Sequence, residues 1–369
     1  MFSSKLKTLV VPVYIDDLLP MGDEVLVNNF IEYLPKVFKM SSAGEADFFL
    51  GMRIERLADE QVLCLDQYAF IKTLLDQFKV PEDSSAPTPL SPQEDLVPSK
   101  TPISEVNPVT QSKYQSVIGS LMYLMLGTRP DLAYAVGKLA RFSTNPSPAH
   151  FNAADRVLWY INGTKDLYLD FDPGTNKGVS IDAFTNADWA QSKLDRKSTS
   201  GYFFYINGTV FSWLSKKQST VAMLTMEAEY IGLFHASQQA AWTQQFLAQV
   251  GQPLGYPIEI YCNSEAAQNT AAAKNPHKLL KHLDVKYHSI REHVEMKTIK
   301  IRSVPTANNT TDLLTKSLPV AMFWKHYSSL GLEPLNYDEE EEEVDEMLTP
   351  PLDDEGKTLE SETRGSVEQ

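Results

Sequence analysis

Cysteine and long hydrophobic runs are both scarce in this sequence. Only two cysteines, Cys64 and Cys262, occur in 369 residues, which excludes a disulfide framework and a cysteine-based zinc site. No apolar run approaches the roughly 18 residues that a membrane-spanning helix needs, and no signal-peptide pattern opens the chain. We therefore expect an intracellular protein, cytoplasmic or nuclear, that is not secreted and has no membrane partner.

An excess of positive charge is also missing. The net charge is −15 at pH 7, which argues against nucleic-acid binding if it is spread over the whole chain. Residues 333–369, however, contain 15 acidic and 2 basic side chains and carry −13 of this charge, which leaves −2 for the rest. This acidic tail has almost no apolar side chains to bury, and we expect it to be disordered. The remaining chain is compatible with a nucleic-acid partner.

Prolines divide the chain. Seven of them stand between Pro81 and Pro108, a density that blocks regular structure and predicts an extended linker or surface segment over residues 81–110. The other predicted units are residues 1–80, a helical region over 111–177, an α/β domain over 178–332 that folds on its own, and the acidic tail over 333–369.

The α/β domain follows from alternating strand and helix patterns. Asn207-Gly208 between two apolar runs is the strongest short signal for a β-hairpin, and a long helical pattern ends at Gly251. The order of elements predicts a mixed five-stranded sheet with helices. The expected strands cover residues 179–190, 200–208, 209–218, 258–262 and 298–306, and the main helices cover 226–250, 281–296 and 318–331.

Four positions in this domain carry acids or asparagines at the ends of predicted elements. Asn186 lies in FTNADWA, Glu227 in MEAEY, Asn263 in IYCNSEAA and Asp312 in TTDLLTKSL. This layout resembles the ribonuclease H domain that ends the Pol polyprotein of copia-type LTR retrotransposons, where the matching segments read D-A-D-W-A-G, S-S-x-E-A-E-Y, C-D-N and A-D-x-L-T-K. The resemblance implies a ribonuclease H-like fold whose four acids hold Mg²⁺ ions against an RNA–DNA hybrid. Only Glu227 and Asp312 keep their charge, so we expect metal binding to be weak or lost.

A second set of motifs extends the resemblance to nearly the whole chain. Asp16 and Asp17 lie in YIDD, which is similar to the Y-V-D-D hairpin of reverse transcriptase, and TRPDLAYAV is also shared. The resemblance implies that residues 1–80 are the end of a truncated reverse-transcriptase palm with its thumb, and that 111–177 are a connection region. Polymerases use carboxylates to hold two Mg²⁺ ions about 3.5–4 Å apart. Because the strand with the family's third carboxylate does not precede Tyr14, we expect no polymerase activity.

The two asparagines predict a loss of hybrid cleavage. Asn caps helices about as well as Asp, so the changes at Asn186 and Asn263 should spare the fold. Each removes a negative charge, and unit charges about 4 Å apart interact by about 4 kcal/mol at a dielectric near 20. We expect a Pol fragment whose ancestral reverse transcription and RNA cleavage are both lost. Two alternatives stay open: a non-catalytic scaffold that binds nucleic acid or has been recruited by the host, and an active ribonuclease H whose ligands have shifted to Asp182, Asp188 or Glu265.

Basic residues and histidines gather in one late segment. Between Lys274 and Arg302 there are eight Lys or Arg side chains against three acids, together with four of the seven histidines. A basic face that follows a nucleic-acid backbone, a metal site and a solvated helix are the three interpretations, although the histidine spacing matches no known ligand pattern. On the first interpretation, the residues that contact nucleic acid are Lys281, His282, Lys286 and Arg291.

Overall fold

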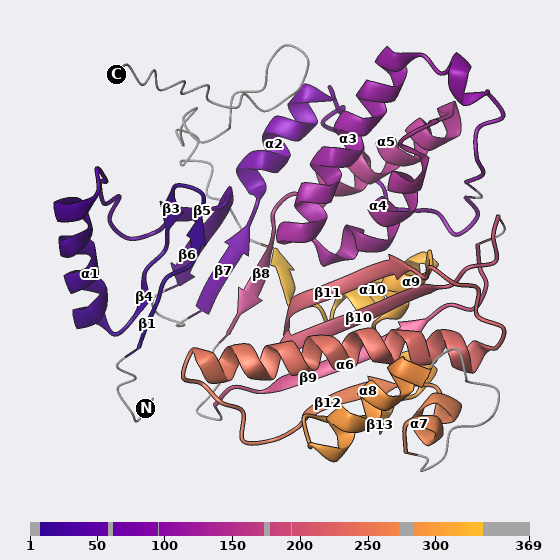
Figure 1. Cartoon of the computed structure of the whole chain (residues 1–369). Coiled ribbons are helices and arrows are strands. Elements are labelled where there is room, and N and C mark those ends of the chain that lie inside the picture. Colours follow the sequence, from indigo (N-terminus) through magenta and orange to yellow (C-terminus); the bar gives the residue numbers. More distant parts are fainter. Residues whose placement is uncertain are drawn as a thin grey trace, which may run out of the picture.

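The computed structural model describes residues 8–57, 62–94, 96–172, 178–192, 194–272 and 284–334. These residues build two five-stranded sheets and two short two-stranded ladders (Figure 1). Two predicted nucleic-acid contacts, Lys281 and His282, lie outside the described residues, as does the acidic tail from residue 335 onward. None of the described helices combines the length and the hydrophobicity that crossing a lipid bilayer requires.

The first sheet belongs to the α/β region and has the strand order β11-β10-β9-β12-β13. Strands β9, β10 and β11 are antiparallel neighbours, whereas β12 is parallel to β9 and β13 is parallel to β12. The mixed five-stranded sheet predicted from the sequence is therefore confirmed. Its strands are β9 (Ile181–Ala187), β10 (Thr199–Ile206), β11 (Thr209–Lys217), β12 (Ile258–Cys262) and β13 (Ile299–Ser303).

The predicted hairpin joins β10 to β11. Asn207 and Gly208 have φ angles of 51° and 100°, and a two-residue turn of this hand requires positive φ at both central residues. The side chain of Asn207 also accepts a hydrogen bond from the backbone N–H of Ser180 at 2.9 Å. The turn is thus attached to the residue that precedes β9.

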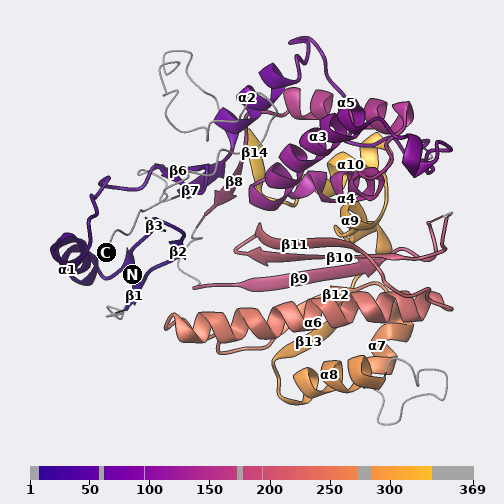
Figure 2. The same ribbon diagram turned by 45° about the horizontal axis from the view of Figure 1, so that its top comes forward.

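Helices cover both faces of this sheet (Figure 2). Because side chains alternate along a strand, β10 sends Phe204 to one face and Phe203 and Tyr205 to the other, into two separate hydrophobic clusters. The Phe204 face packs on α6, α7 and α8, and the other face packs on the helical region. The helices are α1 (Glu24–Val37), α2 (Tyr68–Gln77), α3 (Pro108–Gly127), α4 (Ala133–Leu139), α5 (Pro148–Asn162), α6 (Thr225–Gln249), α7 (Glu265–Ala272), α8 (Asp284–Glu295), α9 (Asp312–Thr315) and α10 (Val320–Tyr327).

The second sheet is antiparallel and has the order β14-β8-β7-β6-β5. It joins strands from distant parts of the sequence. The residues expected to end the helical region form β8, and the expected start of the tail at residue 333 falls inside β14. The strands are β5 (Phe48–Phe49), β6 (Met52–Leu57), β7 (Val62–Asp66), β8 (Leu167–Phe171) and β14 (Leu332–Pro334).

The Pro-rich segment follows α2, and its described residues have no regular structure apart from a 3-10 turn at Ile103–Glu105. It is nevertheless packed onto the molecule, because Leu90 and Leu96 are buried in the cluster shared with the helical region. Helix α3 then begins at Pro108, with the Asn107 side chain as its N-cap. Proline suits the first helical position because that N–H has no intrahelical partner.

The TRPD motif forms a buried ion pair. Arg129 and Asp131 have no exposed side-chain surface and are 2.8 Å apart. Arg129 also donates to the carbonyl and hydroxyl oxygens of Thr164, and the Tyr160 hydroxyl donates to Asp131 at 2.8 Å. A buried pair is tolerated only when such additional hydrogen bonds are made. The motif therefore fastens the start of α4 to the end of α5.

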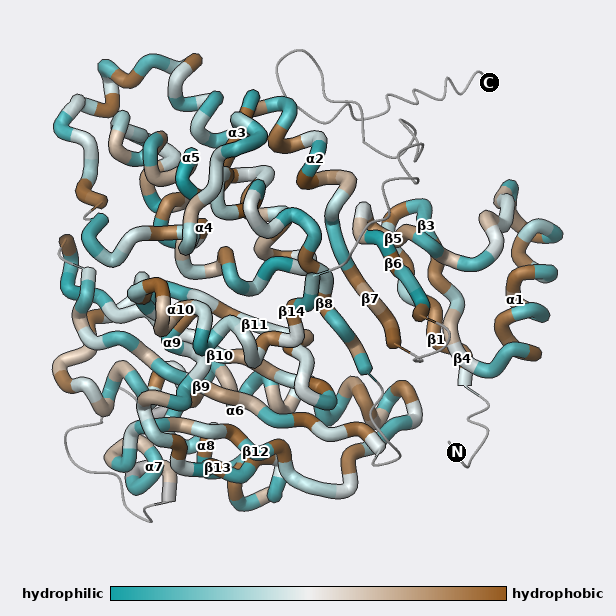
Figure 3. Tube along the Cα trace, turned by 180° about the vertical axis from the view of Figure 1, so that it is seen from behind, coloured by the Kyte–Doolittle hydropathy of each residue, from teal (hydrophilic) through white to brown (hydrophobic). Residues whose placement is uncertain are grey.

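The first described residues form a separate small substructure. Helix α1 alternates hydrophobic and hydrophilic residues along its length (Figure 3), yet none of its residues is buried. The ladders before it are β1 (Leu9–Val10) with β4 (Met21–Gly22), and β2 (Val13–Tyr14) with β3 (Asp17–Leu18).

Candidate active site

Two of the four predicted positions are in direct contact. Asn186 lies near the end of β9 and Asp312 begins α9, and the Asn186 Nδ2 atom donates a hydrogen bond to Asp312 Oδ1 at 2.6 Å. Both residues are buried. The other oxygen of Asp312 lies 2.8 Å from the Nζ atom of Lys316, one helical turn later. The two residues are 126 positions apart in the sequence, so the fold itself creates this contact.

Helix α9 is held against the sheet by its own contacts. The Asn309 side chain donates to the carbonyl oxygen of Thr185 at 2.9 Å, and the Ser215 hydroxyl donates to that of Leu314 at 2.7 Å. A Cβ atom at Gly201 of β10 would lie only 2.6 Å from the Cβ of Leu314. Gly201 therefore permits the close approach that brings Asp312 to β9.

A glutamate that sequence reasoning missed completes this contact. Glu229 of α6 is buried, and its Oε2 accepts a hydrogen bond at 3.0 Å from the backbone N–H of Ala187, the residue after Asn186. Burial raises the pKa of Glu229 to about 8; the Ala187 N–H opposes this rise, while the negative charges of Asp312 and Asp188 add to it. Glu229 thus belongs to the same buried polar cluster.

Glu227 lies elsewhere on the same helix. Its Oε2 accepts a hydrogen bond at 2.8 Å from the backbone N–H of Met223, in the loop before α6. Two residues correspond to about 200° around a helix, so Glu227 and Glu229 point in different directions. The signal that distinguishes them is Gly232, three residues after Glu229, where a Cβ would lie 3.1 Å from the Asn186 carbonyl oxygen. Gly232 therefore marks the face of α6 that packs against β9, and Glu229 lies on this face.

Asn263 extends the cluster along the sheet. Cys262 of β12 is in register with Thr185 of β9, so Asn263 and Asn186 follow paired residues of neighbouring parallel strands. The Asn263 Nδ2 donates to the Thr306 hydroxyl at 3.3 Å, whereas its Oδ1 has no hydrogen-bond partner among the described residues. The negative charge of Glu229 contributes, after burial, to the raised pKa of Cys262. These facts place Glu229 close to the end of β12.

The three acids considered as shifted ligands take other positions. Asp188 accepts a hydrogen bond from the backbone N–H of Thr199, and burial raises its pKa to about 6. Asp182 lies at the opposite end of β9, where burial and the charge of Glu259 raise its pKa. Glu265 is exposed at the start of α7.

The donor atoms do not fit a Mg²⁺ site. Magnesium takes oxygen ligands, chiefly carboxylates, but an amide N–H of Asn186 points at one Asp312 oxygen and the Lys316 ammonium pairs with the other. Within the described part of the chain, no three His, Cys, Asp or Glu side chains come together in a way that could hold a metal ion. Both oxygens of Asp312 are therefore already paired with donors of this chain.

The acids of the YIDD motif are placed on a hairpin. Strands β2 and β3 pair with each other through Tyr14 and Asp17, and Asp16 lies in the turn. Both aspartates are exposed. In the described residues this hairpin joins neither five-stranded sheet.

The two described residues of the predicted basic face have partners within the domain. Lys286 lies 5.9 Å from the ring centre of Phe234 on α6. Arg291 forms an ion pair with Glu295 at 3.1 Å and lies over the ring of Tyr287. Both positive charges therefore already interact with side chains of this domain.

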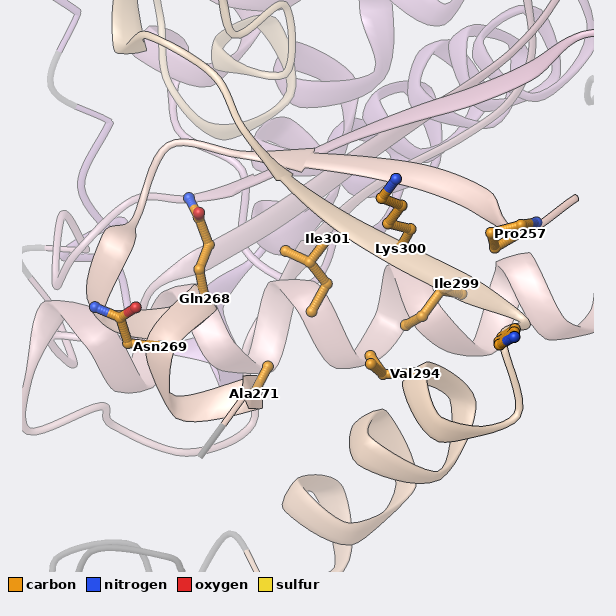
Figure 4. A pocket seen from close by; sticks show the side chains of 9 residues that line it. Pro257, Gln268, Asn269, Ala271, Val294, Ile299, Lys300 and Ile301 are labelled. Carbon is orange, nitrogen blue, oxygen red and sulfur yellow. The ribbon is translucent and has the colours of Figure 1, made fainter. Parts of the chain in front are cut away.

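A groove of about 550 Å³ lies between α7, α8 and β13 (Figure 4). Its lining is largely apolar, with Ala271, Val294, Ile299 and Ile301 beside polar groups such as Gln268. None of the four predicted positions nor Glu229 lines it. The groove is separate from the polar cluster.

Comparisons with known proteins identify the family. A family model described as "Reverse transcriptase (RNA-dependent DNA polymerase)" matches residues 2–92. The Pol polyprotein from transposon TNT 1-94 of Nicotiana tabacum is 35% identical over 84% of this chain, and that from transposon RE1 of Arabidopsis thaliana is 32% identical over 87%. The chain spans only 23% and 21% of these two relatives.

Solved ribonuclease H structures show a weaker likeness. The crystal structure of LC11-RNase H1 in complex with an RNA/DNA hybrid covers 37% of this chain, with 18% identity and a TM-score of 0.29. A likeness at this level says nothing about the chemistry of the site. The relatives, in contrast, match most of the chain, and the chain belongs to the Pol polyproteins of copia-type LTR retrotransposons.

Proposed function

We propose that the α/β region is a ribonuclease H-like domain that keeps its fold and has lost cleavage of RNA–DNA hybrids. The observation that carries the proposal is the 2.6 Å hydrogen bond from Asn186 to Asp312. It puts an N–H donor where two-metal phosphoryl chemistry needs a further oxygen ligand. Asn263 removes a second charge, and the raised pKa of Glu229, about 8, keeps that carboxyl largely neutral at pH 7.

Glu229 takes the role that the sequence assigned to Glu227. The glutamate of this site has to lie beside the strand end that carries Asn186, and Glu229 binds the next backbone N–H of that strand. Glu227 instead binds the loop before α6. The retained acids of the ancestral site are therefore Glu229 and Asp312, and the changed positions are Asn186 and Asn263.

DNA synthesis is not expected from the chain as it stands. Asp16 and Asp17 are exposed on a hairpin that pairs only with itself among the described residues. Two-metal catalysis needs carboxylates that hold both ions in a fixed geometry, and an exposed pair on a short turn does not provide it.

The test is cleavage of the RNA strand of a hybrid in Mg²⁺. We expect no cleavage by the chain itself and measurable cleavage by the double revertant Asn186→Asp with Asn263→Asp. Either reversion alone should be at least roughly 100-fold slower, because each missing charge removes several kcal/mol of attraction for the metal ions. Cleavage by the unchanged chain that Glu229→Gln abolishes would overturn the proposal and favour an active ribonuclease H.

A second function, binding of nucleic acid without cleavage, is favoured by the charges around Asp188. The positive charges of Arg141, Lys316 and Lys217 all lower the pKa of Asp188, which burial raises, so three cations lie near Asp188. Lys316 and Lys217 are paired with Asp312 and Asp195, which leaves the exposed Arg141 as the residue to test. Fluorescence anisotropy with a labelled hybrid should show binding that weakens as salt rises. Binding of this kind gives a linear fall of the logarithm of the binding constant with the logarithm of the salt concentration. Replacing the exposed Arg141 by Met should reduce the magnitude of that slope by about 1. Absence of binding at low salt would eliminate this function.

A further inference from the structure

Asp312 is the best-satisfied carboxylate of the cluster, and all of its partners belong to this chain. Oδ1 accepts from the Asn186 amide at 2.6 Å and Oδ2 pairs with the Lys316 ammonium at 2.8 Å. Asp312 has only 6% of its side chain exposed, while Lys316 has 34%. The ammonium therefore lies at the boundary between the buried cluster and solvent.

From this geometry we infer that Asn186 and Lys316 form an internal lock that replaces a metal ion at Asp312, so that the fold is stable without Mg²⁺. The inference rests on the proposed function, because it takes Asn186 and Asp312 as positions of the ancestral site. It goes further by assigning Lys316 a structural role and by making a prediction about stability rather than cleavage.

The charge balance of the lock supports this assignment. Asp312 contributes one negative charge, Lys316 one positive charge and Asn186 none, so the group is neutral as it stands. A buried charge is tolerated when it is paired and hydrogen-bonded, and Asp312 meets both conditions. With Asp at position 186, two carboxylates would face each other across the present hydrogen-bond distance, and their repulsion would require a cation.

The lock also has a mechanical role, because it ties the short helix α9 to the central strand β9. Helix α9 has four residues, too few to be stable without tertiary contacts. Its position depends on the Gly201 contact with Leu314 and on the two partners of Asp312. A helix fastened in this way stays in place without any added ion.

Thermal unfolding with and without Mg²⁺ tests the lock. The unchanged chain should show the same Tm in both conditions, since a metal that does not bind the folded state cannot stabilise it. The Asn186→Asp variant should melt roughly 4–8 °C lower without Mg²⁺ and recover when Mg²⁺ is added. A rise of the unchanged chain's Tm with Mg²⁺, equal to that of the variant, would refute the lock.

Lys316 has a matched control within the chain. Lys316→Met removes an i,i+4 ion pair to a buried carboxylate, whereas Arg291→Met removes the i,i+4 pair with Glu295, which is 69% exposed. Lys316→Met should lower Tm by several degrees and Arg291→Met by about 1 °C or less. Equal effects would mean that no lock exists. If Lys316→Met does not fold, Lys316→Arg serves instead: it keeps the charge and should retain the Tm of the unchanged chain.

The cleavage assay and the thermal unfolding experiment can refute the two proposals independently. If the unchanged chain cleaves the hybrid and its Tm is the same with and without Mg²⁺, the proposed loss of function is refuted and the lock is not. A Tm that rises with Mg²⁺ in a chain that does not cleave would refute the lock and leave the loss of function standing.

Discussion

Glu229 shows how burial and charge act on a single side chain. An ordinary glutamate has a pKa of 4.5, and burial raises that of Glu229 to about 8, with the charges of Asp312 and Asp188 acting in the same direction. Between these two pH values the folded state binds more protons than the unfolded state. By linkage, the contribution of Glu229 to stability is complete below about pH 4.5 and is lost as pH rises toward 8.

Replacing Glu229 by Gln should remove this pH dependence. The amide cannot ionise, so the stability of Glu229→Gln relative to the unchanged chain should increase steadily from about pH 5 to about pH 8. Chemical denaturation at a series of pH values measures the difference. The control is Glu227→Gln, which changes a second buried carboxyl of the same helix, one that accepts from the backbone N–H of Met223. A difference that stays constant with pH would show that Glu229 is not buried as a neutral group.

The same two variants test the site assignment in the double revertant. There, Glu229→Gln should abolish the restored cleavage, because its carboxylate borders Asn186, while Glu227→Gln should leave most of it, because its carboxylate binds the Met223 N–H. Hybrid cleavage in Mg²⁺ is the measurement. The opposite ranking would restore Glu227 to the site, as the sequence alone suggested.

Among the elements, β10 and α9 depend on each other through a glycine. Gly201→Ala would push a Cβ to 2.6 Å from Leu314 Cβ and 3.2 Å from Thr315. Overpacking of this kind costs about 1–3 kcal/mol. Gly119 in α3 is the matched control, because a Cβ there meets nothing within 4 Å and Ala in an exposed helix is favoured by about 0.5–1 kcal/mol. Denaturant unfolding should show that Gly201→Ala lowers the free energy of unfolding and that Gly119→Ala raises it. A change of the same sign in both variants would contradict the proposed close approach.

The longer elements could be predicted from the sequence because local patterns specify them. The Asn207-Gly208 turn, the strand ending at Cys262 and the helix ending before Gly251 carry their own signals of turn chemistry and periodicity. Helix α9 and strand β14 have four and three residues, too short for any periodicity. They exist because distant strands hold them, which a local pattern cannot show.

The site was predictable in part for the same reason. Asn186, Asn263 and Asp312 stand at element ends, where the family motifs also mark them. The choice between Glu227 and Glu229 depended on which face of α6 meets β9, and both residues fit the motif equally. The ion pair of Lys316 with Asp312 could be expected from their i,i+4 spacing. The hydrogen bond from the Asn186 amide to the other Asp312 oxygen could not, because it joins residues that are far apart in the sequence.

At the scale of the whole molecule, the mixed sheet is shared between two cores. Phe203, Tyr205 and Val210 are buried in the cluster that also contains α3, α4 and α5. The predicted boundary between the helical region and the α/β domain therefore runs through one continuous hydrophobic core. This arrangement bears directly on whether residues 178–332 fold alone, as the sequence led us to expect.

A piece covering residues 178–334 should be markedly less stable than one covering 62–334. Without the helical region it exposes large side chains of the sheet, each worth roughly 1.5–3 kcal/mol when buried. We expect a lower Tm and binding of the dye ANS for the shorter piece, and neither for the longer one. A shorter piece that melts cooperatively at the Tm of the longer one would show that the domain is autonomous after all.

The pairing of β14 with β8 also means that the last described strand covers an edge of the second sheet. The ribosome delivers β8 long before Leu332, the β14 residue that pairs with Leu169. Until then the outer edge of β8 presents free N–H and C=O groups, a template on which other chains can assemble. A chain that ends before Leu332 would therefore keep this edge open, and we expect it to aggregate more readily than a chain that includes β14.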